Sequence, residues 1–269
     1  MTTIRKVVAA AALAWAAVVP GAANAQAADD WRFNAILYGY FPSVGGSTAF
    51  PQAGSPISVD ADTVLDNLQG AFMGTFEAGK GRWGVFTDVM YLNVGGSVSR
   101  TRDIAIGGSE LPVGATADLD MDLKGWVWTL VGTYQFGTDR KAPFQVLAGA
   151  RLVDVEQKLD WQTSGNIGSI PLPGRQGSVS DQASNWDAIV GVKGRVAFGS
   201  EGEWFIPYYV DVGTGQSDLT WQAIAGIGYS FKWGEILAAW RYLDYDFKSG
   251  NSIESLNFNG PAIGVGFRW

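Results

Sequence analysis

Eight charged residues are the side chains best placed for chemistry, because this chain contains no histidine and no cysteine. The absence of His removes the commonest general base and the commonest metal ligand. The absence of Cys removes disulfides and thiolate metal sites. Four of the eight are acids and four are bases: Glu77, Asp88, Asp187, Asp211, Arg151, Lys193, Arg195 and Arg241. Buried charges are tolerated when they are paired and hydrogen-bonded, so this balance predicts an interior ion-pair network.

No catalytic, metal or cofactor site is predicted from these residues. The Ser–His and Asp–His arrangements of membrane enzymes both need the missing His. Asp187 and Asp211 could act as an acid–base pair, as in glycosidases, but neighbouring Arg and Lys residues would hold both carboxylates ionised. Asp60 and Asp62 offer the oxygens that hard cations prefer, yet their spacing is not that of a calcium loop. We therefore predict that the chain is not an enzyme; an atypical His-free enzyme is the last alternative.

The eight charges share one feature: each lies on the less apolar face of a stretch in which apolar residues recur at every second position. From 186 to 198, for example, Trp186, Val190 and Phe198 alternate with Asp187 and Lys193. Period-two alternation over such lengths indicates a β-strand with two different surroundings. Ten strands are predicted: 31–42, 69–79, 82–94, 121–137, 143–157, 185–199, 203–214, 218–232, 234–247 and 257–269.

Aromatic residues gather at the ends of the apolar faces, and Val, Ile, Ala or Leu fill the middle. A lipid-facing surface between two interfacial girdles has this arrangement. In a soluble β-sandwich, the alternative, the apolar face would be the core and the strands would be shorter, about 5–6 residues. The aromatics predicted at the lipid interface are Trp83, Trp126, Trp128, Tyr134, Phe136, Trp186, Phe198, Trp204, Trp221, Tyr229, Phe231, Phe267 and Trp269.

The connections between the predicted strands alternate in length. Those after 79, 137, 199 and 232 are short, whereas 43–68, 95–120, 158–184 and 248–256 are longer; the connection at 215–217 is a short exception. We therefore predict an all-β fold: a closed antiparallel transmembrane β-barrel of about ten strands, with short periplasmic turns and longer extracellular loops. Eight or twelve strands are the alternatives. Within the first long connection, residues 57–68 are expected to form a short helix at the barrel mouth.

The first 25 residues are predicted to be a cleaved signal peptide, which leaves residues 26–269 as one barrel domain. Arg5 and Lys6 precede the apolar run 7–19, and Ala23-Asn24-Ala25 offers a small-x-small cleavage site. The mature chain would carry 17 basic against 26 acidic residues, a net charge of −9. This charge argues against nucleic-acid binding, which needs a basic face. The expected location is the bacterial outer membrane.

Five stretches in order along the chain resemble a group of uncharacterised proteobacterial outer-membrane β-barrel proteins in the OmpA-like small-barrel superfamily. The stretches are Val64-Leu65-Asp66-Asn67-Leu68, Arg82-Trp83-Gly84-Val85-Phe86, Leu219-Thr220-Trp221-Gln222, Arg241-Tyr242-Leu243-Asp244-Tyr245 and Gly260-Pro261-Ala262-Ile263-Gly264. The resemblance spans most of the mature chain and implies fold and location. It supplies no reaction or ligand for particular residues.

A structural or surface-interaction role is the predicted function, because a ten-stranded barrel is narrow. About eight strands are just filled by side chains, and open channels come at about 16–18. A charge-paired and largely filled lumen follows, and a narrow porin-like channel for small solutes is the alternative. The expected partners are outer-membrane lipids and the outer-membrane assembly machinery, which the last strand ending in Trp269 would engage. The sequence identifies no ligand.

Overall fold

The structure is a computed structural model that describes residues 30–48, 55–100, 105–106, 109–110, 115–136, 142–167, 170–171, 175–249 and 253–269. The predicted signal peptide, residues 1–25, lies outside this part of the chain and stays a prediction. Among the described residues, no helix has the length and apolar character needed to cross a membrane.

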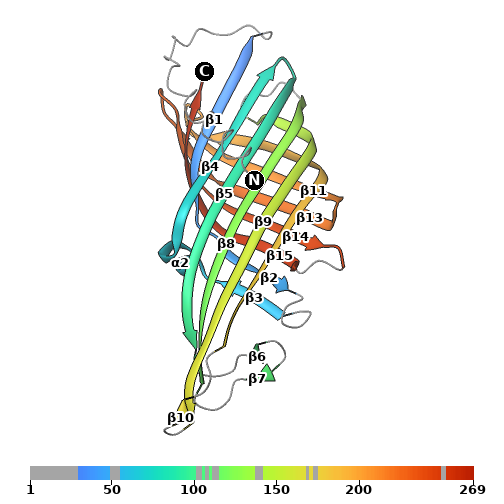
Figure 1. Ribbon diagram of the computed structural model, residues 1–269. Coiled ribbons are helices and arrows are strands. Elements are labelled where there is room, and N and C mark those ends of the chain that lie inside the picture. The colour runs from blue at the N-terminus through green and yellow to red at the C-terminus, as the bar shows by residue number, and fades with distance from the viewer. Residues whose placement is uncertain are drawn as a thin grey trace, which may run out of the picture.

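Ten antiparallel strands, paired in sequence order, close into a barrel (Figure 1). They are β1 (Trp31–Tyr40), β4 (Leu68–Lys80), β5 (Trp83–Arg100), β8 (Ala115–Phe136), β9 (Phe144–Ile167), β11 (Arg175–Phe198), β12 (Trp204–Gly215), β13 (Ser217–Ser230), β14 (Glu235–Phe247) and β15 (Ile253–Arg268). The barrel closes where β1 pairs with β15, from Asn34 opposite Arg268 to Tyr40 opposite Ala262. The prediction of a closed ten-stranded barrel is confirmed.

The two faces of each strand differ as the alternation requires. On β11, Val190 is 58% exposed while its neighbour Ile189 is 1% exposed. On β13, the outward Ile227 is 47% exposed, whereas Gln222 points inward and is 2% exposed. Because successive side chains of a strand point to opposite sides, this alternation sets every second residue against the interior.

The two ends of the barrel are different. Tight connections join β4 to β5, β11 to β12 and β13 to β14 at one end, the turn end. Gly81 supports the first of these turns with a φ of 59°, in the left-handed region that favours glycine. The last strand returns to this end, where the Phe33 and Trp269 backbones exchange two hydrogen bonds of 2.9 and 3.2 Å. The opposite end is called the loop end.

Four strands run well beyond the rest at the loop end. The pairing of β5 with β8 extends to Arg100, and that of β9 with β11 extends to Arg175. Residues 95–120 and 158–184 were expected to be loops, but much of each continues the strands. These stretches are rich in Gly, Ser and Asp, which are typical of loops. Of the side chains that the structure describes there, Gln176, Ser178 and Ser180 are exposed. We call this four-stranded extension the projecting sheet (Figure 1).

The first long connection is folded. It contains β2 (Ser43–Thr48), which pairs with β15, then β3 (Ser55–Val59), and a helix, α2 (Ala61–Asp66). The helix falls within the 57–68 segment predicted to be helical, and its Val64 side chain is buried. The remaining elements are the short strands β6 (Ala105–Ile106), β7 (Ser109–Glu110) and β10 (Ile170–Pro171).

Candidate functional site: the barrel interior

The middle of the barrel interior holds a fully buried ion pair between β9 and β12. Arg151 binds Asp211 in a bidentate arrangement: Nη1 donates to Oδ1 at 2.9 Å, and Nη2 donates to Oδ2. Its remaining Nε donates to Thr129 Oγ1 at 3.1 Å. Both charged side chains have an exposed fraction of 0%. Two parallel charge-assisted hydrogen bonds fix this pair in one geometry.

A second buried pair lies at the same level, between β14 and β5. Arg241 Nη2 is 2.8 Å from Asp88 Oδ2, with side-chain exposures of 3% and 6%. Tyr38 Oη joins the two, donating to Asp88 Oδ1 at 2.6 Å and accepting from Arg241 Nη1 at 2.7 Å. Gln222 Oε1 accepts from Arg241 Nε at 3.0 Å. Both charges lie inward, as the alternation of their strands predicts.

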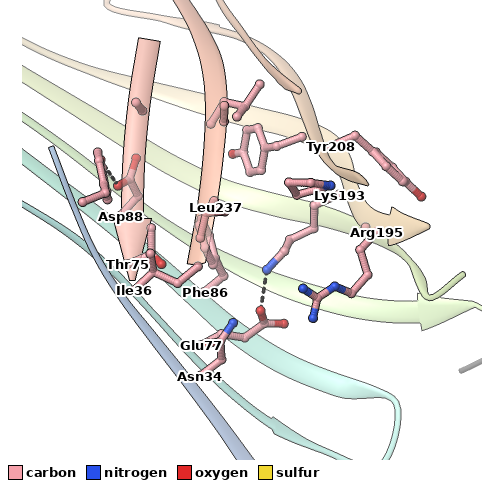
Figure 2. Close-up of a pocket in the computed structure, with 18 of the residues that line it drawn as sticks. Asn34, Ile36, Thr75, Glu77, Phe86, Asp88, Lys193, Arg195, Tyr208 and Leu237 are labelled. Atoms are coloured by element: carbon pink, nitrogen blue, oxygen red, sulfur yellow. Dashed lines mark hydrogen bonds and ion pairs between the residues drawn. The ribbon is translucent and has the colours of Figure 1, made fainter. Parts of the chain in front are cut away.

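A third pair lies nearer the turn end. Lys193 Nζ is 2.5 Å from Glu77 Oε2, and Gln145 Nε2 donates to Glu77 Oε1 at 3.1 Å. The ammonium group also sits 4.0 Å from the centre of the Phe86 ring. Figure 2 shows Lys193 and Glu77 reaching toward each other across the interior. Their side chains are 15% and 21% exposed, so this pair retains some contact with solvent.

Glu235 is a buried interior acid that was not among the eight predicted charges. Its Oε2 accepts from Arg195 Nη2 at 2.8 Å and also forms an ion pair with Arg268. The Arg195 guanidinium lies 3.6 Å from the centre of the Phe205 ring. Glu235 and Arg241 are six residues apart on the same strand, so their side chains point to the same side. The alternation that predicted an inward Arg241 therefore also indicates an inward Glu235.

Asp187 differs from the other predicted charges, because the described residues form no ion pair with it. Its Oδ1 accepts a hydrogen bond from the Ser217 backbone N–H at 2.8 Å. Arg151 lies directly opposite on β9, but its guanidinium turns to Asp211. The carboxylate is therefore used to hold the β12–β13 connection in place.

A cavity of about 240 Å³ occupies the turn-end half of the interior. Glu77, Lys193 and Arg195 line it together with apolar side chains such as Phe86 and Leu237 (Figure 2). Within the described residues, no cluster of three or more acids could hold a metal ion. The cavity wall thus combines paired charges with apolar side chains.

An apolar cluster fills the interior on the loop-end side of the buried ion pairs. Its sixteen buried residues come from eight strands and from α2: Tyr40, Val44, Val64, Met73, Met90, Leu92, Val94, Val127, Val153, Val155, Leu243, Tyr245, Phe247, Ile253, Leu256 and Phe258. The expectation that the inward face is polar is therefore wrong for this half of the barrel. The apolar side chains pack against one another across this half of the interior.

The thirteen aromatics predicted at the lipid interface are exposed or half-buried on the exterior. They form two bands. Near the turn end, the ring centres of Trp83 and Tyr134 are 4.7 Å apart. Toward the loop end, the ring centres of Trp128 and Trp186 are 6.0 Å apart. On β8 the outermost aromatics of the two bands, Trp126 and Phe136, are ten residues apart, and the innermost, Trp128 and Tyr134, are six apart. At ~3.3 Å per residue and a ~40° tilt, the outer spacing is about 25 Å along the barrel axis, the height of a transmembrane barrel's apolar belt.

Replacing Lys193 with methionine is expected to lower the free energy of unfolding by only about 1 kcal/mol, because water in the turn-end cavity can hydrate the Glu77 carboxylate left behind. Urea unfolding in detergent micelles, followed by tryptophan fluorescence, measures this change. Glu77→Gln serves as the matched variant and should cost a similar amount. A loss several times larger in either variant would mean that this end of the interior is dry.

No family model matches the chain, and no curated protein matches it. Among solved structures, it is similar to Ail of Yersinia pestis (10% identity, TM-score 0.33, covering 90% of this chain and 99% of that one). It is also similar to the translocator domain of the autotransporter NalP from Neisseria meningitidis (12%, 0.30, 89% and 88%) and to Salmonella typhi OmpF (9%, 0.25, 89% and 97%). With scores this low, the barrel assignment stands on the strand pairing described above.

Proposed function

We propose that this protein is an integral barrel of the bacterial outer membrane whose role is structural or surface-interacting, not conductive. The observation that carries the proposal is the closed interior. Two layers block it: the buried ion pairs of Arg151 and Arg241, and the apolar cluster beyond them. A barrel whose interior is blocked by these two layers has its exterior and its loop-end surface available for function.

The exterior supports the membrane location. Large apolar side chains cover it on strand after strand, among them Val85 at 51%, Val190 at 58%, Ile227 at 47% and Ile263 at 57% exposed. Soluble monomers rarely expose contiguous apolar patches larger than a few hundred Å². A band of this kind between two aromatic girdles fits hydrocarbon, with lipids as the surrounding partner.

The projecting sheet supports the surface-interacting role. Its outer strand, β11, pairs with β12 only from Asp187 onward, so residues 175–185 have β9 as their one strand partner among the described residues. The opposite edge is the end of β5, which runs past Val94, where its pairing with β4 stops. Open edges present unpaired backbone N–H and C=O groups, which other chains recognise by adding a strand.

Planar-bilayer recording separates this proposal from the narrow-channel alternative. Purified protein reconstituted into a bilayer is expected to give no single-channel steps, because the buried ion pairs and the apolar cluster block the interior. A large porin reconstituted in the same membrane serves as the positive control. Well-defined steps from the wild-type chain would contradict the proposal and favour a passive channel for small solutes.

A further inference from the structure

The barrel wall is incomplete between β1 and β4. These strands pair from Trp31 opposite Lys80 to Leu37 opposite Gly74, and the pairing ends there. Beyond this point the chain follows β15, first as the end of β1 and then as β2, while β4 continues along β5 as far as Leu68. Residues 68–73 of β4 therefore have no strand partner on the β1 side among the described residues. Helix α2 lies beside this end of β4 (Figure 1).

A cavity of about 220 Å³ occupies the gap. Its ten lining residues are apolar, aromatic or glycine, and none carries a charge. The two tyrosines among them direct their hydroxyl groups elsewhere: Tyr38 Oη bonds to Asp88, and Tyr40 Oη donates to the Arg241 carbonyl oxygen at 3.1 Å. Only their rings are left to face the cavity, so it offers a ligand apolar contact and almost no polar recognition.

The cavity is reached from the exterior. Ala71 belongs to the inward face of β4, between Gly70 and the outward Phe72, yet it is exposed. Leu65 on α2 and Leu68 at the start of β4 also line the cavity and are 42% and 38% exposed. These three side chains mark its mouth.

The mouth lies at the loop-end aromatic girdle. Phe72, which is 55% exposed, is the register partner of Tyr91, whose ring is 4.4 Å from that of Trp126. In the proposed outer-membrane setting, on which this inference rests, this depth is the boundary where acyl chains begin.

We propose that an acyl chain of an outer-membrane lipid inserts through this gap and binds in the cavity beneath α2. An apolar cavity of about 150 Å³ lined by Leu, Ile and Phe stays dry and accepts a hydrocarbon such as benzene. The present cavity is larger, is lined by similar side chains and opens beside hydrocarbon. A chain that enters it regains the dispersion contacts that an empty cavity forfeits.

Photolabelling in proteoliposomes tests the proposal. The probe is phosphatidylethanolamine with a diazirine midway along one acyl chain, and adducts are mapped by peptide mass spectrometry. Adducts are expected to concentrate in residues 64–73. Ala71→Trp should lower them about tenfold by filling the cavity with a large side chain. Ala71→Leu, a smaller change, should lower them less. Ala238→Trp on the exterior of β14 is the matched control and should leave them unchanged.

Two outcomes would overturn the inference. One is labelling spread evenly over the apolar belt and insensitive to Ala71→Trp; the barrel would then still be in the membrane, and only the lipid site would be lost. The other is labelling of residues 64–73 by a diazirine fatty acid but not by the phospholipid probe, which would make the ligand a free acid. A complete lack of labelling on the belt would instead contradict the membrane location itself.

Discussion

Replacing Arg151 with methionine is expected to lower the free energy of unfolding by about 3–5 kcal/mol, the usual cost of leaving one partner of a buried ion pair without the other. The reason is the surroundings of Asp211. Its carboxylate is fully buried, and both of its oxygens accept from the Arg151 guanidinium. Without the arginine, the negative charge remains in a region that water does not reach.

Urea unfolding in micelles measures the effect, and two further variants make it decisive. Lys158→Met removes the cation of an exposed ion pair with Asp160, whose side chains are 47% and 39% exposed, and should cost less than about 1 kcal/mol. The double variant Arg151→Met/Asp211→Leu removes both charges and should recover much of the lost stability. If Arg151→Met cost no more than Lys158→Met, the middle of the barrel would have to be hydrated.

The ten strands were predictable because a barrel wall has two unlike surroundings. On β11, Val190 faces outward and Lys193 faces inward. Because successive side chains face these two surroundings in turn, apolar residues recur at every second position of the sequence. The tight turns were predictable for the same reason, since the alternation stops at each of them. The even number of strands then brings the first and last strands together at the turn end, as the hydrogen bonds between Phe33 and Trp269 show.

The packed half of the interior could not be predicted from alternation. On β5, the inward Met90 and Leu92 are as apolar as the outward Val89 beside them. When both faces of a strand are apolar, the alternation of apolar and polar residues is lost, and the sequence no longer indicates which residues face the interior. The projecting sheet was not predicted because its residues include many Gly, Ser and Asp, the residue types that also favour loops.

The choice of ion-pair partners depends on stagger, which the sequence does not contain. Closing a sheet into a barrel tilts and offsets the strands, so residues far apart in register come to face each other across the interior. Arg151 illustrates the effect: it lies opposite Asp187 in the sheet but binds Asp211. The alternation predicts which charged side chains face the interior, but their ion-pair partners follow from the geometry of the closed barrel.

Val190→Arg is expected to lower the free energy of unfolding in lipid by about 2–4 kcal/mol, as for a cation on the lipid face of a transmembrane barrel near the bilayer centre. Val190 points outward, is 58% exposed and is flanked on the same face by Trp186 and Phe198. It lies four residues below Trp186, or about 10 Å along the axis at ~3.3 Å per residue and a ~40° tilt. This depth is well inside the apolar belt, and urea unfolding from lipid vesicles measures the change.

Ser180→Arg provides the control, because it places the same side chain at an exposed position of the same strand on the projecting sheet. Its effect should stay within about 0.5 kcal/mol, as for ordinary surface substitutions. A barrel surrounded by water would accept arginine equally well at both positions, because Val190 would then be one more solvated side chain. Equal stabilities would therefore show that the apolar exterior faces something other than lipid, whereas a difference of the expected size places Val190 in the hydrocarbon and residue 180 beyond it.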